Sequence, residues 1–127
     1  LTVRDETTTG QPTGELTLDF LTERITVREL IRSRVYQEVK DFNTRRPGLY
    51  RGLVQPREAD AAPGGYRLRS GQELDWKKQF EAALAAFQRG RILLLVGGQQ
   101  ADSLDQEIVV GPDVEATFLK LVPLVGG

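Results

Sequence analysis

The chain has 127 residues, 28% of them charged, and a formal net charge of −1 at pH 7. This length suits one domain with a real core, and the balanced composition is typical of a soluble globular protein. Because Cys and His are missing, disulfides, thiolate nucleophiles, Cys-type metal sites and histidine proton shuttles are excluded. With no convincing carboxylate or Ser–Lys pair either, we expect that the chain is not an enzyme.

The apolar runs are all shorter than a membrane span, and no signal peptide opens the chain. We therefore expect a cytoplasmic protein that does not contact a membrane. Because the first residue is Leu1, we expect that an initiator Met or a longer segment has been removed.

The N-terminal region predicts a β-hairpin. Residues 1–9 alternate and are rich in β-branched side chains, and residues 15–21 alternate again. Between them, residues 10–14 read Gly-Gln-Pro-Thr-Gly, which is typical of a turn.

An amphipathic helix follows the hairpin. Thr26 and Glu29 have the spacing of a capping box, and Ile25 and Leu30 suit a hydrophobic staple. Apolar residues then recur at helical spacing as far as Phe42, which predicts one buried face. The opposite face carries Arg28, Arg32, Gln37 and Lys40.

Residues 43–73 are rich in Pro and Gly, and a structureless loop this long is uncommon inside a compact domain. We expect residues 49–54 to pair with residues 66–68 as a small hairpin. A second helix is predicted over residues 75–89, with Asp75 as N-cap and Gly90 at the C-terminal left-handed position. Its apolar stripe is predicted to be core; the stripe is Trp76, Phe80, Ala83, Leu84 and Phe87.

The last third of the chain predicts three strands. Residues 92–96 form a continuous apolar run, followed by a Gly97-Gly98 turn and a short strand over residues 99–102. Residues 103–107 and 111–113 are predicted turns. The final strand spans residues 114–122, with Ala116 and Phe118 on one face.

That strand leads into a tail that reads Val122-Pro123-Leu124-Val125-Gly126-Gly127. Glycine tolerates almost any φ, so such a flexible tail can thread a narrow channel and present its carboxylate. The tail reaches about 20 Å when extended. Pro123 discourages continuation of the sheet, and Leu124 and Val125 offer apolar contacts to a partner.

The order of these elements resembles the ubiquitin-like β-grasp superfamily: a hairpin, an amphipathic helix, a strand, a turn, another strand and a diglycine. The most specific match lies in residues 91–127, where the segments 92–100, 103–108 and 111–119 precede a Pro-containing Gly-Gly tail. These segments resemble the small subunits of molybdopterin synthase, and the tail also resembles thiamine sulfur carriers and bacterial ubiquitin-like modifiers. The resemblance covers residues 1–42 by pattern only.

The resemblance implies an α+β fold, a β-grasp mixed sheet with one packed helix, in a single domain over residues 1–127. Residues 43–90 are then an insertion that carries the second helix. It also implies that Gly127 and Gly126 are the site of activation and that Val122, Pro123, Leu124 and Val125 bind a partner. That partner is an adenylating enzyme that uses Mg-ATP, so the chain itself binds no metal or cofactor.

Three functions remain open. The first is a protein modifier that passes, with a conjugating enzyme or ligase, to target proteins through an isopeptide bond. The second is a sulfur carrier that forms a C-terminal thiocarboxylate for cofactor biosynthesis, and the third is a non-covalent β-grasp adaptor. We expect no nucleic-acid partner, because the net charge is slightly negative and aromatics do not interleave with a continuous basic stripe.

Overall fold

The computed structural model describes residues 1–7, 12–69 and 71–121. Its strands are β1 (Thr2–Thr7), β2 (Pro12–Thr17), β3 (Arg24–Thr26), β4 (Ala59–Ala62), β5 (Gly65–Leu68), β6 (Ile92–Val96), β7 (Gln99–Ala101), β8 (Glu107–Val109) and β9 (Glu115–Lys120). Its helices are α1 (Val27–Arg45) and α2 (Trp76–Gln88). The fold is α+β, with a mixed five-stranded sheet.

The chain forms two compact units. The first comprises Leu1–Glu29 and Ala86–Gly127, and the second comprises Leu30–Ala85. The second unit covers residues 43–85 of the stretch over residues 43–90 that the resemblance implies is an insertion. The description of the whole chain as a single domain stays a prediction.

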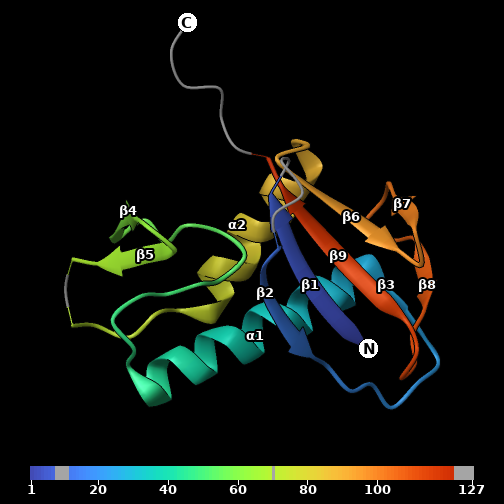
Figure 1. Cartoon of the computed structure of the whole chain (residues 1–127), viewed down its shortest axis with the longest axis horizontal. Coiled ribbons are helices and arrows are strands. Elements are labelled where there is room, and N and C mark those ends of the chain that lie inside the picture. The colour runs from blue at the N-terminus through green and yellow to red at the C-terminus, as the bar shows by residue number, and fades with distance from the viewer. Residues whose placement is uncertain (8–11, 70, 122–127) are drawn as a thin grey trace, which may run out of the picture. The chain divides into compact units, whose positions relative to one another are not determined.

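The first unit is built on a sheet with the strand order β2-β1-β9-β6-β7 (Figure 1). Strands β1 and β2 pair antiparallel, which confirms the predicted hairpin, although β2 begins at Pro12, within the predicted turn, and ends at Thr17 and not at Leu21. Strand β9 lies between β1, to which it is parallel, and β6, to which it is antiparallel. The first and last strands of the chain are therefore neighbours at the centre of the sheet.

One face of this sheet is buried. Val3, Leu94, Ala116 and Phe118 come from the three central strands and have no exposed surface. Because side chains alternate along a strand, residues next to them in sequence point to the other face. The predicted alternation of Ala116 and Phe118 is thus confirmed.

A second pair of strands, β3 and β8, was not predicted. They pair antiparallel, so that Glu107 and Ile108 belong to a strand and the predicted turn over residues 103–107 is one residue shorter. The turn is hydrogen-bonded to the start of α1, since the Val27 N–H donates to the Gln106 carbonyl and the Arg28 N–H donates to the Leu104 carbonyl.

The first turn of α1 has the predicted capping box. The Glu29 N–H donates to Thr26 Oγ1 at 3.1 Å, and the Thr26 N–H donates to Glu29 Oε2 at 3.2 Å. Two backbone donors that a helix start leaves without an internal partner are therefore satisfied locally.

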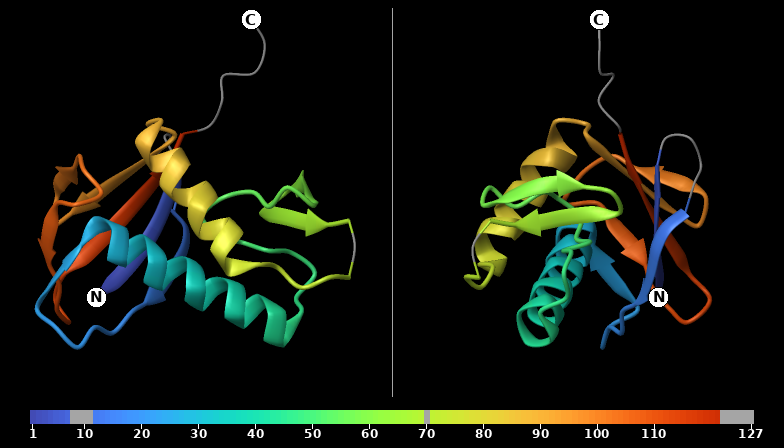
Figure 2. Two further views of the ribbon diagram at one scale, coloured as in Figure 1. Left: turned by 180° about the vertical axis from the view of Figure 1, so that it is seen from behind. Right: turned by 60° about the vertical axis from the view of Figure 1, so that its left-hand side comes forward.

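In the second unit, strands β4 and β5 form a hairpin (Figure 2). The predicted pairing of residues 49–54 with 66–68 is wrong, apart from one bridge between Tyr50 and Tyr66. The reason is the Pro63-Gly64 turn, in which Gly64 has a φ of +83°. A two-residue turn of this kind closes a hairpin locally, so residues 59–62 become the partner.

Helix α2 begins and ends as predicted. Asp75 Oδ1 accepts the Lys77 N–H at 2.9 Å, and Gly90 has a φ of +71°. The prediction that its apolar stripe is core holds for Ala83 and Phe87, which are buried, but not for Trp76, Phe80 and Leu84, which are half-buried. Neither described helix combines the length and the apolar content that crossing a bilayer requires.

Candidate functional site

The predicted site residues Val122, Pro123, Leu124, Val125, Gly126 and Gly127 lie outside the described residues. The structure describes the chain up to Leu121, which is the point from which this tail departs. The candidate site is therefore the part of the first unit that carries the tail, together with the surface next to it.

The strand before the tail is held on both sides. All residues of β9 are paired with β1, from Thr2 opposite Glu115 to Thr7 opposite Lys120. On the other side, β9 pairs with β6 from Ala116 to Lys120. Beyond the strand, the Leu121 N–H donates to the Arg91 carbonyl at 3.0 Å. A strand with two neighbours has few ways to move, so the position of Leu121 is fixed by the sheet.

An ion pair lies next to the end of β9 on the buried side. Lys120 Nζ is 3.8 Å from Asp5 Oδ2, and the Asp5 side chain is only 7% exposed. A carboxylate this far from water needs a cation or hydrogen bonds. Lys120 is partly exposed and lies on the same side of β9 as the buried Phe118, two residues before it.

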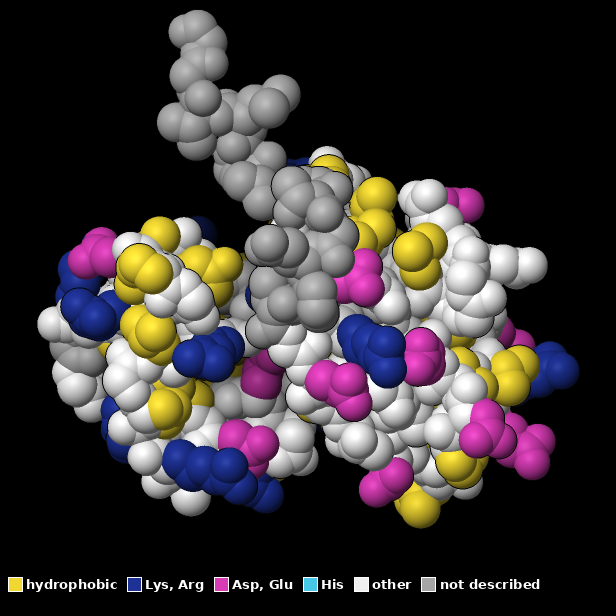
Figure 3. Space-filling view, viewed as in Figure 1, with side chains coloured by type: hydrophobic (Ala, Val, Ile, Leu, Met, Phe, Trp, Pro, Cys, Tyr) yellow, Lys and Arg dark blue, Asp and Glu magenta, His cyan; other side chains and the backbone are white. Residues whose placement is uncertain are grey.

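The solvent side of the sheet is charged at one end and apolar at the other. At the charged end, Arg4 contacts Glu15 at 3.4 Å and Glu115 at 3.2 Å. At the end where β9 leaves the sheet, Leu93 is paired with Leu119, and both are half-buried. Figure 3 shows hydrophobic side chains gathered over β6 in this view.

We define the apolar end of this face by Leu93, Leu95, Leu119 and Leu121 and call it the leucine face. These residues alternate with Ile92, Leu94 and Phe118, which are buried on the other side. Leu121 is 39% exposed and directly precedes the tail. The leucine face thus extends to Leu121, the last described residue before the tail.

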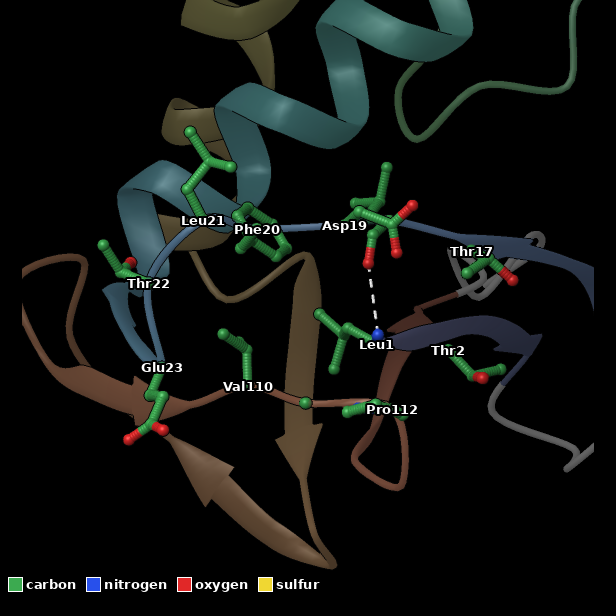
Figure 4. A pocket seen from close by; sticks show the side chains of 12 residues that line it. Leu1, Thr2, Thr17, Asp19, Phe20, Leu21, Thr22, Glu23, Val110 and Pro112 are labelled. Carbon is green, nitrogen blue, oxygen red and sulfur yellow. Dashed lines mark hydrogen bonds between the residues drawn. The ribbon is translucent and has the colours of Figure 1, made fainter.

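The first unit also contains a cavity of about 400 Å³ (Figure 4). It is lined by Leu1 and Thr2, by residues 17–23 and by residues 110–112, and the Leu1 nitrogen donates to the Leu18 carbonyl at 3.1 Å. These residues adjoin the start of β1 and the loop before β9. The tail leaves from the other end of β9, so this cavity is not part of the candidate site.

A buried polar cluster lies in the second unit. The Arg34 guanidinium contacts Glu38 Oε2 at 3.2 Å, while Glu38 Oε1 accepts the Leu53 N–H at 2.9 Å and the Tyr50 hydroxyl at 3.4 Å. Burial, reinforced by the negative charge of Glu38, raises the pKa of Tyr50 well above its usual value. Tyr50 is therefore a neutral donor, and the cluster attaches the loop over residues 49–54 to α1.

Sequence reasoning missed one surface of the second unit. Trp76 and Tyr36 meet edge to face with centroids 5.2 Å apart, and Phe80 lies 6.3 Å from Trp76. Arg32 lies over the Trp76 ring and Lys40 over the Tyr36 ring. The available signal was the spacing of Arg32, Tyr36 and Lys40, which puts them on one side of α1.

Comparison with known proteins returned no relative. No family model matches the chain, and it matches neither a curated protein nor a solved structure. Its function therefore has to be inferred from its own residues and their geometry.

Proposed function

We propose that this chain is a ubiquitin-like protein modifier, activated at the carboxylate of Gly127 and transferred to amino groups of target proteins. The observation that supports this most is the position of β9. The strand that leads into the tail is the central strand of the sheet, paired on both sides up to Lys120. A tail that starts from a fixed point can be delivered reproducibly into the active site of a partner.

The strand order supports a β-grasp fold for the first unit. In a β-grasp sheet the first and last strands are parallel neighbours at the centre, and a hairpin partner flanks the first strand. The order β2-β1-β9-β6-β7 has this arrangement, with β1 and β9 parallel. It also agrees with the sequence resemblance, which is most specific over residues 91–127.

The chemistry follows from the low reactivity of a carboxylate. A partner enzyme would join the Gly127 carboxylate to the α-phosphate of Mg-ATP, which forms an acyl-adenylate and releases pyrophosphate. A partner cysteine then attacks the acyl carbon and expels AMP. An amine of the target attacks the resulting thioester and releases the thiol, so that an isopeptide bond remains.

The composition of the chain is consistent with catalysis by partner enzymes. It has no cysteine, so every thiol in this sequence of steps belongs to a partner. The leucine face adjoins the tail, and an activating enzyme that covers both would bury the exposed part of Leu121. If further residues follow Gly127 in the full-length protein, hydrolysis of the bond after Gly127 would precede activation.

The main alternative is a sulfur carrier, which shares the first step. Sulfide would then attack the adenylate in place of a cysteine and expel AMP, and the product is a thiocarboxylate at Gly127. A partner persulfide would instead give an acyl disulfide, which a second partner thiol would reduce to the thiocarboxylate while the two partner sulfurs form a disulfide. A non-covalent adaptor is the other alternative, and it would use the leucine face without any chemistry at the tail.

The test is co-expression with an adenylating enzyme and its genomic neighbours, followed by tryptic digestion of the total protein. Trypsin cleaves after Lys120, the last basic residue, so a conjugated lysine would keep residues 121–127 as a branched remnant. Intact mass spectrometry of the chain runs in parallel. We expect branched peptides with this remnant, and none from a variant that lacks Gly126 and Gly127.

The other outcomes separate the alternatives. Exchange of one oxygen for sulfur in the intact chain, without branched peptides, would identify a sulfur carrier and refute the modifier. If the intact mass of the chain is unchanged, and the variant that lacks both glycines still supports full activity in cells, then neither the modifier nor the sulfur carrier is correct and the adaptor is the remaining function.

A further inference from the structure

The second unit carries a surface that the proposed tail chemistry does not use. We call it the aromatic–cation cluster and define it by Arg32, Tyr36 and Lys40 of α1 and Trp76 and Phe80 of α2. The Arg32 guanidinium carbon lies 5.2 Å from the centroid of Trp76, and Lys40 Nζ lies 5.9 Å from that of Tyr36. Two cations thus flank a group of three aromatic rings.

The cluster is on the surface. Tyr36 is 43% exposed and Trp76 and Phe80 are half-buried, whereas Val39 and Ala83, which adjoin them on the same helices, are buried. Single exposed apolar residues are common, but a group of aromatic residues with an arginine has the composition of a protein interface.

The charges of the cluster are not neutralised by the described part of the chain. Arg28, Arg34 and Arg69 each contact a carboxylate. Among the described residues Arg32 and Lys40 have only their aromatic contacts. A guanidinium that lies over a ring still has N–H groups to donate to a carboxylate, so Arg32 suits a two-point hydrogen bond.

We propose that the aromatic–cation cluster binds an acidic segment of a partner protein. Carboxylates of that segment pair with Arg32 and Lys40, and an apolar side chain between them packs on Tyr36 and Phe80. This goes beyond the proposed function, because it concerns a surface of the second unit and holds whether or not Gly127 is activated.

The geometry favours a peptide over a nucleic acid. Bases bind single-strand sites by stacking on open ring faces. Here Arg32 lies over the Trp76 ring, and Tyr36 meets Trp76 at 89°, so these contacts would have to break. The net charge of −1 also disfavours a polyanion.

The experiment uses Trp76, which is the only tryptophan of the chain and reports on this surface directly. A phage-displayed library of random peptides is selected on the whole protein and counter-selected on the R32E/K40E variant. We expect the enriched peptides to carry Asp or Glu on both sides of an apolar residue. Such a peptide should change Trp76 emission, and its binding should weaken as salt rises.

Matched variants decide the outcome. R32E/K40E should lose at least about tenfold in affinity, and the neutral variant R32Q/K40Q should lose less. The control is R67E, a charge reversal at an exposed residue of β5, which should bind like the wild type. Circular dichroism establishes that all variants fold.

Four results would overturn the proposal. One is enrichment of basic or purely apolar peptides, and another is an equal loss of binding in R67E. The third is self-association of the wild type in sedimentation velocity that R32E/K40E abolishes, since the occupant would then be a second copy of this chain. A single-stranded oligonucleotide that binds more tightly than the selected peptides would likewise refute a protein partner.

Discussion

At the scale of single residues, the contact between Tyr50 and Gly52 shows how tightly the second unit is built. Tyr50 is 2% exposed, packs edge to face on Phe42 and donates to Glu38. A Cβ added to Gly52 would lie 2.0 Å from the Tyr50 ring. Position 52 therefore has to be glycine because a buried ring occupies the space of its side chain.

Gly52→Ala should lower the free energy of unfolding by about 1–3 kcal/mol, because Tyr50 cannot move away without losing its contacts with Phe42 and Glu38. The measurement is urea denaturation followed by Trp76 emission. Gly48→Ala is the control, since a Cβ there meets nothing within 4 Å. Equal stability of the two variants would show that Tyr50 is not held as described.

The pKa of Tyr50 predicts a dependence of stability on alkaline pH. The folded protein keeps the phenol protonated above pH 10.0, the usual pKa, at which half of the unfolded chains have lost that proton. The unfolded state then binds fewer protons, so the free energy of unfolding falls as pH rises. The slope from this group reaches about 1.4 kcal/mol per pH unit.

Tyr50→Phe removes the group, so its stability should fall less steeply above pH 10 than that of the wild type. Chemical denaturation at successive pH values measures both slopes, and the remaining titrating groups are common to the two proteins. Parallel curves would mean that the phenol is not confined to its neutral form in the fold.

At the scale of elements, β9 connects the fold to the proposed activity. The same strand contributes Phe118 to the core, Leu119 to the leucine face and its end to the tail. Each of these roles depends on the alternation of side chains in a strand that is paired on both edges. Changes on its solvent side are therefore expected to affect partners more than folding.

The double variant Leu93→Thr/Leu119→Thr should lower kcat/KM for adenylation by about tenfold or more, because it removes apolar contact area next to the tail. Threonine retains β-propensity, so the sheet should persist. Val109→Thr is the control, as Val109 is 56% exposed on β8. Pyrophosphate release measures the rate, and an unaffected double variant would exclude the leucine face from recognition.

At the scale of the whole molecule, the proposed activity depends on reach. The tail has to bridge the distance from the fixed end of β9 to the nucleotide of a partner. Two properties of the tail contribute to its activation by the partner enzyme, namely its length and its apolar contacts. Variants can change one of them without the other.

Deletion of Leu124 and Val125 shortens the tail by about 7 Å and should abolish adenylation. Leu124→Ser/Val125→Ser keeps the length and should retain measurable activity with a raised KM, since only apolar contacts are lost. Pyrophosphate release distinguishes the two. Activity of the shortened chain at the wild-type rate would show that reach is not limiting.

The sequence alone determined the features that depend on near neighbours in the chain. The capping box of Thr26 and Glu29, the cap at Asp75 and the positive φ of Gly90 involve groups within a few residues, so local chemistry is sufficient to predict them. The candidate tail was also found from sequence, although its residues lie outside the described part of the chain.

Tertiary structure decided what depends on residues far apart in sequence. The parallel pairing of β1 with β9 and the pairing of β3 with β8 join opposite ends of the first unit, and no local pattern encodes a partner at that separation. Trp76 has the periodicity of a core residue. In the structure, Trp76 is only half-buried, and it contacts Tyr36 and Arg32 of another helix. How deeply a side chain is buried depends on which residues the fold places next to it, and helical periodicity alone does not specify them.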